Sequence, residues 1–129
     1  MNEQPWDFIV CTERATLREL AKTWRYAAHV AGSAATIALV AADQDERDSV
    51  FYDMGQATLQ MMVTAADMGI GSSHASVGDQ DLARRILRLP DDRSVVGLVA
   101  FGYPSDRPLR PIQHPARRPA DQVIHREQW

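Results

Sequence analysis

Hydrophobic residues along this chain fall into three short, nearly continuous runs. Residues 8–11 and 35–41 are apolar at almost every position, and residues 95–101 form a third run of the same kind. Continuous apolar character over this length is typical of buried strands, whereas a half-exposed strand alternates with polar residues. The pattern therefore predicts three strands, with 35–41 in the interior of a sheet that is covered on both faces.

Two shorter helices are expected around these runs. Thr16 and Glu19 have the spacing of a capping box, in which each side chain bonds the other residue's amide. We expect this helix to begin at Thr16 and to run to about Val30. A second helical pattern covers residues 79–89 and ends at a proline.

The longest helical pattern runs from Asp48 to Met68. It carries two adjacent apolar rows, which are Val50, Met54, Ala57, Met61, Ala65 and Met68, and Phe51, Gly55, Leu59, Met62 and Ala66. A helix that is apolar over most of its circumference lies at the centre of a fold or at an interface. Gly69 follows the last periodic residue, where a helix commonly ends in a left-handed glycine.

The alternation of strands and helices indicates an α/β (α+β) fold with a sheet flanked by helices in two or three layers. After residue 103 the pattern stops, and prolines stand at positions 104, 108, 111, 115 and 119. Such a segment runs extended and needs another surface to hold it, for example that of a partner subunit. Val123 and Ile124 are expected to add a short edge strand. We expect one domain over 1–129, with a core at 1–103 and an arm at 104–129.

Composition places the chain among ordinary globular proteins. Its 129 residues are 45% hydrophobic and 24% charged, and the net charge of −3 argues against nucleic acid as a partner. Cys11 is the single cysteine, so no internal disulfide or zinc-type cysteine pair can form, and a reducing cytoplasm fits. No signal peptide and no apolar run of ~20 residues is visible, so we expect a soluble cytoplasmic protein without a membrane partner.

The glycines at 69 and 71 suggest a nucleotide loop but do not complete one. His74 stands where a dinucleotide fingerprint needs its third glycine, and the segment follows a helix instead of a strand. Two glycines still allow backbone amides to approach a flat ligand. Residues 74–78 lack the first glycine of a nucleophile elbow, which disfavours a hydrolase. The four histidines lack metal-ligand spacing, so we expect surface or hydrogen-bonded histidines, no metal site and no side-chain catalyst.

Arg117 and Arg118 are the strongest candidates for an anion contact. From Asp106 onward there are five arginines and three acidic residues, so the end of an otherwise acidic chain is basic. A solvated surface pair is the plain alternative. A guanidinium group, however, matches the geometry of a phosphate.

Read in order, five segments resemble the nitroreductase family. They are Asn2-Glu3-Gln4-Pro5-Trp6 before the first strand, Tyr52 to Ala57, Leu59 to Ser72, Phe101-Gly102-Tyr103-Pro104, and Arg117-Arg118-Pro119 with the end of the chain. The resemblance implies a homodimer with FMN at its interface, reduced by NAD(P)H and reoxidised by a small acceptor such as a nitroaromatic compound or a quinone. It also implies that the long helix lies between the subunits and that the arm wraps the partner.

The resemblance assigns the cofactor contacts residue by residue. Asn2 and Gln4 would contact the flavin ring or the ribityl chain. Backbone groups of Ile70, Gly71 and Ser72 would follow the ring edge near N5. Arg117, together with Arg118, would face the phosphate.

One departure from the family leaves alternatives open. The family carries N-terminal helices with an Arg-x-Ser-x-Arg phosphate grip, and this sequence starts immediately before Asn2, so we expect an N-terminally shortened member with weaker FMN binding. One alternative is a catalytically impaired dimerisation or flavin-binding remnant. Another is an unrelated small α/β domain whose proline arm makes protein contacts.

Overall fold

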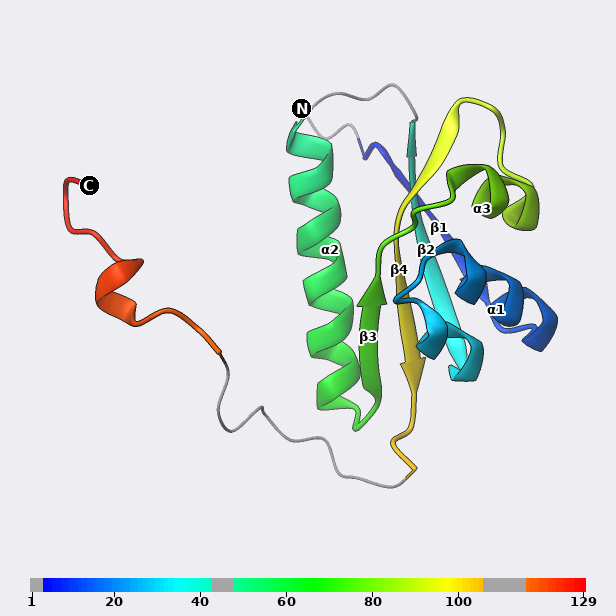
Figure 1. Cartoon of the computed structure of the whole chain (residues 1–129), viewed down its shortest axis with the longest axis horizontal. Helices are drawn as coiled ribbons and strands as arrows, with labels where there is room; N and C mark the ends of the chain where they lie inside the picture. Colours follow the sequence, from blue (N-terminus) through cyan, green and yellow to red (C-terminus); the bar gives the residue numbers. More distant parts are fainter. Residues whose placement is uncertain (1–3, 43–47, 106–115) are drawn as a thin grey trace.

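The molecule is a three-layer arrangement in which one sheet lies between a long helix and a group of short helices (Figure 1). The computed structural model describes residues 4–42, 48–105 and 116–129. The expected division into a core at 1–103 and an arm at 104–129 includes residues outside these ranges and stays a prediction.

The sheet has four strands in the order β1-β2-β4-β3, and every neighbouring pair is antiparallel. The strands are β1 (Trp6–Cys11), β2 (Ala35–Ala42), β3 (Gly71–Ala75) and β4 (Arg93–Gly102). An antiparallel sheet flanked by helices confirms the predicted fold class in its α+β form. The apolar runs at 35–41 and 95–101 both form strands, as predicted, and 35–41 is in the interior of the sheet, as expected. The strand that contains 95–101 is central as well.

The strand β1 lies at an edge of the sheet, so the expectation that residues 8–11 are buried was wrong for half of them. Phe8 is 44% exposed and Val10 is 65% exposed, while Cys11 is buried. Ile9 and Cys11 belong to the core beneath the short helices. The long helix packs on β3 and β4, so it leaves the other face of β1 open (Figure 1).

The short helices cover the face of the sheet that includes Ala38, Val40, Val95 and Leu98. They are α1 (Arg14–Leu20), two 3-10 turns (Ala21–Thr23 and Ala28–Gly32) and α3 (Gln80–Leu87). The side chain of Asp79 caps α3 by accepting from the Leu82 amide at 2.8 Å.

The first helix differs from its prediction at both ends. It begins at Arg14, and Glu13 caps it without a side-chain hydrogen bond, so Thr16 and Glu19 form no capping box. It ends at Leu20, ten residues before Val30, and the chain continues as separate 3-10 turns. The Thr23 hydroxyl bonds the Leu20 carbonyl at 2.7 Å, and this side chain-to-backbone bond competes with continuation of the helix.

The helix α2 (Asp48–Asp67) covers the opposite face and matches its prediction to one residue. Val50 and Met54 pack there against Leu39, Ala41 and Val99. At its end, the Gly69 amide bonds the Ala66 carbonyl at 3.0 Å, and the Ile70 amide bonds the Ala65 carbonyl at 2.8 Å. Gly69 has φ +72, so this is a Schellman ending with glycine in the left-handed position, as predicted.

The strand β3 was not predicted. The glycines at 69 and 71 indicated a loop, but Gly71 and Ser72 lie in a strand that pairs with β4 from Gly71 opposite Gly102 to Ala75 opposite Leu98. Its sequence, Gly-Ser-Ser-His-Ala, has neither the apolar run nor the β-branched residues that indicate a strand. Pairing with β4 therefore overrides a weak local preference.

The described C-terminal residues, 116–129, are exposed throughout and lie beyond α2, away from the sheet (Figure 1). Val123 and Ile124 follow a 3-10 turn (Ala120–Gln122) and form no strand, so the expected edge strand was wrong. A strand needs a neighbour to pair with, and this segment has none within the described part of the chain.

Candidate functional site

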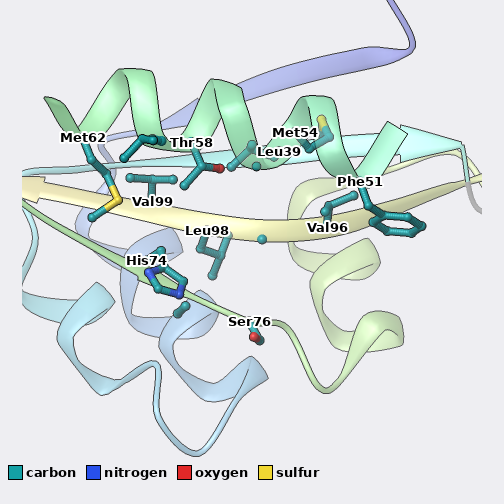
Figure 2. A pocket seen from close by; sticks show the side chains of 14 residues that line it. Leu39, Phe51, Met54, Thr58, Met62, His74, Ser76, Val96, Leu98 and Val99 are labelled. Carbon is teal, nitrogen blue, oxygen red and sulfur yellow. The ribbon is translucent and has the colours of Figure 1, made fainter. Parts of the chain in front are cut away.

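A groove of about 500 Å³ lies between α2 and the strands β3 and β4 (Figure 2). Its floor and most of its helix side are apolar, with Leu39, Met54, Met62, Val96 and Val99 among the lining residues, and Thr58 adds one hydroxyl group on the helix side. His74 and Ser76 lie on its other side, on β3 and just past its end. The groove is therefore amphipathic, with a polar edge along one strand.

The alternation of side chains along β3 produces this polar edge. Ala75 is buried in the core beneath the short helices, so its neighbours in the strand point to the opposite face, toward α2. His74 pairs with Val99, and Ser72 pairs with Phe101. Both partners, Val99 and Phe101, belong to the core on the α2 side of the sheet. Ser72, His74 and Ser76 thus have the i, i+2, i+4 spacing of one strand face.

A β-bulge in β4 shapes the groove floor. Leu39 pairs with Gly97, but the next residue, Val40, pairs with Val95, so Val96 has no partner on β2. Val96 and Gly97 both line the groove. The Gln80 side chain binds beside this bulge, because its amide donates to the Val95 carbonyl at 2.8 Å and its oxygen accepts from the Val95 amide at 3.0 Å.

We expect Gln80→Leu to lower the free energy of unfolding by about 2 kcal/mol, because it leaves the backbone amide and carbonyl of buried Val95 without these partners. Urea unfolding followed by circular dichroism measures the change. Gln80→Glu keeps one acceptor and should lose roughly half as much. If Gln80→Leu were as stable as the unaltered chain, the two hydrogen bonds between Gln80 and Val95 would contribute nothing to the free energy of unfolding.

The turn that follows β3 is tied to the 3-10 segment of the other layer. The Thr23 carbonyl accepts from the amides of Gly78 at 3.0 Å and Asp79 at 2.9 Å. The Trp24 indole lies directly on Gly78, where a Cβ atom would stand 2.1 Å from a ring carbon. These contacts fix the chain two residues beyond Ser76, at the end of the groove's polar edge.

A second groove, of about 510 Å³, lies on the other side of α2. Phe8, Ile37, Met61, Ile70 and Phe101 make it strongly apolar. The polar residues lining it are Gln60 and Thr64. These two polar residues belong to α2, whereas those of the first groove, His74 and Ser76, come from the strand side.

The predicted cofactor residues are not gathered at one place in this single chain. Ile70 lines the second groove, while Gly71 and Ser72 line neither groove, although Ser72 is on the strand face that includes His74. Gln4 is exposed just before β1, with φ 48. Asn2 is outside the described residues.

Arg117 and Arg118 are both exposed and belong to the segment beyond α2 (Figure 1). Their assignment as phosphate contacts, like that of the other predicted residues, therefore stays a prediction. The lining residues His74, Ser76, Val96 and Gly97 were missed. The alternating Ser72, His74 and Ser76 were the signal that could have indicated a strand with one polar face.

The described part of the chain offers neither a reactive thiol nor a metal site. Burial raises the pKa of the Cys11 thiol, which keeps it protonated and makes it a poor nucleophile. Among residues 4–42, 48–105 and 116–129, no group of three or more His, Cys, Asp or Glu side chains could hold a metal ion. No helix in these ranges is long and apolar enough to cross a membrane.

Comparisons with known proteins agree with this architecture. The model of the nitroreductase family matches residues 13–103. A curated protein of Archaeoglobus fulgidus, "Putative NADH dehydrogenase/NAD(P)H nitroreductase", is 28% identical and covers 99% of this chain and 76% of its own length. A protein of Methanothermobacter thermautotrophicus with the same name is 25% identical over 100% of this chain and 68% of its own length.

The fold also matches solved structures. An FMN-dependent nitroreductase of Clostridium difficile R20291 superposes with a TM-score of 0.82 at 17% identity, and the match covers 98% of this chain and 78% of that one. At this identity the likeness shows a common fold.

Proposed function

The chain belongs to the nitroreductase family, and from this premise we propose that it is an FMN-dependent oxidoreductase that takes electrons from NAD(P)H. The two curated relatives are named for NAD(P)H, and a protein of the same fold is named FMN-dependent. Their names support the choice of cofactor and of electron donor. The acceptor we propose is a small nitroaromatic compound, a quinone or a similar molecule, and the compartment is the cytoplasm.

The single observation that carries the proposal is the amphipathic groove beside β3. FMN has a flat ring system with a polar pyrimidine edge at one end and an apolar dimethylbenzene end at the other. A groove with Met54 and Met62 on the helix side and His74 and Ser76 along the opposite edge fits both halves of such a ring. Bound there, FMN would supply the hydride chemistry, while the chain supplies position and exclusion of water.

We further propose that the enzyme is a homodimer held together by α2. The helix exposes Tyr52 at 71%, Leu59 at 63% and Val63 at 60%, on the side opposite the buried Val50 and Met54, and Leu59 also lines the groove beside β3. Exposed apolar residues gathered on one face of a helix indicate an interaction surface. The C-terminal segment lies beyond the same helix, where it would reach a second copy (Figure 1).

A titration with FMN tests the proposed function. We expect quenching of FMN fluorescence to saturate at one flavin per chain, and NADH or NADPH to bleach the bound flavin under anaerobic conditions. Weak binding without bleaching would favour the impaired remnant. No binding at millimolar FMN would exclude the flavoprotein and favour a domain used for protein contacts.

The phosphate contact gives a prediction for Arg117. We expect Arg117→Ala to weaken FMN binding about 10- to 100-fold, because one charge-assisted hydrogen bond contributes roughly 1.5–3 kcal/mol. Riboflavin, which has no phosphate, should bind both proteins equally. Arg126→Ala, in the same exposed segment, is the matched control and should leave FMN affinity unchanged. An equal loss of FMN and riboflavin affinity would assign Arg117 to another role.

A further inference from the structure

The groove beside β3 has one titratable side chain among its described lining residues, that of His74. The other lining side chains are apolar or, at Thr58 and Ser76, carry a hydroxyl group. A neutral imidazole offers one N–H donor and one acceptor, and a protonated one offers two donors. His74 is thus the strongest hydrogen-bonding group that the described part of this groove contains.

The imidazole is also available to a ligand. In the described part of the chain, no side chain or backbone group forms a hydrogen bond or ion pair with it, and no carboxylate lines the groove. Val99 lies directly opposite on β4, and Met62 approaches from α2 (Figure 2). Once a ligand covers this exposed side chain and excludes water, a single donor interacts more strongly with its acceptor than it does in water.

We propose that His74 binds reduced FMN more strongly than oxidised FMN and thereby sets the reduction potential of the enzyme. This inference rests on the proposed function. Reduction adds two electrons to the ring and increases the negative charge on its polar half. A hydrogen bond to a charged acceptor is roughly twice as strong as one to a neutral acceptor, so the imidazole N–H favours the reduced form.

Three substitutions separate this role from a structural one. His74→Phe and His74→Ala both remove the donor, while His74→Gln retains an N–H group. Because His74 is exposed on an edge strand, the apoproteins should unfold at the same urea concentration as the unaltered chain. Ser73→Ala, a neighbour on the opposite face of β3, is the matched control.

The measured quantities are the dissociation constants of oxidised and reduced FMN and the midpoint potential of the bound flavin. We expect His74→Phe and His74→Ala to change the affinity for oxidised FMN less than threefold and to weaken binding of reduced FMN about tenfold. For a two-electron couple, a tenfold change in this ratio lowers the potential by about 30 mV. His74→Gln should recover at least half of that shift, and Ser73→Ala should show none.

Two results would overturn the inference while FMN binding itself persists. One is an unchanged affinity for both redox forms in the two donor-free variants, and the other is an equal loss of affinity for the two redox forms, which would make His74 a general binding group. Failure of the unaltered chain to bind FMN would instead overturn the proposed function, and this inference with it.

Discussion

Adding one methyl group at Gly78 should destabilise the fold by about 3 kcal/mol, because the Trp24 indole already occupies the space. The new Cβ atom would stand 2.1 Å from one ring carbon and 2.5 Å from the next, far inside van der Waals contact. Either the indole or the turn must move. Overpacking of this kind costs about 1–3 kcal/mol and sometimes more. Urea unfolding of Gly78→Ala followed by tryptophan fluorescence measures the loss.

A double-mutant cycle assigns the loss to this contact. In a Trp24→Leu background the ring is absent, so Gly78→Ala should become nearly neutral, and the coupling energy should approach the full effect. Gly97→Ala is the matched control, since its Cβ atom would meet the Ala75 carbonyl oxygen at an ordinary 3.6 Å. A loss that persists without the indole would show that Gly78 matters through its backbone instead.

The contact between Trp24 and Gly78, which fixes the turn at the end of the groove, could not be predicted from the sequence. The sequence predicts Trp24 within a helix that continues to about Val30, far along the chain from Gly78. Their meeting depends on the 3-10 break after Leu20, which brings the Thr23 carbonyl to the turn after β3. Long-range contacts of this kind leave no periodic pattern in the sequence.

The long elements were predictable for the opposite reason. Twenty residues of α2 carry a consistent helical period and a glycine ending, and the central strands β2 and β4 are continuous apolar runs. Local pattern and tertiary packing agree there. In β3 they disagree, because Ser72 and His74 form a polar strand face only when β4 supplies the pairing. The side of the groove that β3 forms could therefore not be predicted, because the sequence of this segment does not resemble that of a strand.

The second large effect is expected at the centre of the proposed dimer interface. Leu59→Arg should weaken dimerisation about a thousandfold, because it places a charge in an apolar contact without a partner. In a two-fold symmetric interface each substitution occurs twice, so a cost of about 2 kcal/mol per copy gives this factor. Analytical ultracentrifugation across a range of protein concentrations measures the dissociation constant.

The control is Ala15→Arg, which adds the same side chain to an exposed alanine of α1 on the other face of the sheet. It should leave the dimer intact, and neither substitution should unfold the monomer, since both positions are exposed. Leu59 lines the groove beside β3 but Val63 does not, so Val63→Arg should weaken dimerisation and FMN binding in parallel without changing the groove itself. A dimer that survives both Leu59→Arg and Val63→Arg would show that α2 is not the subunit interface, and the exposed apolar face of this helix would then require another partner.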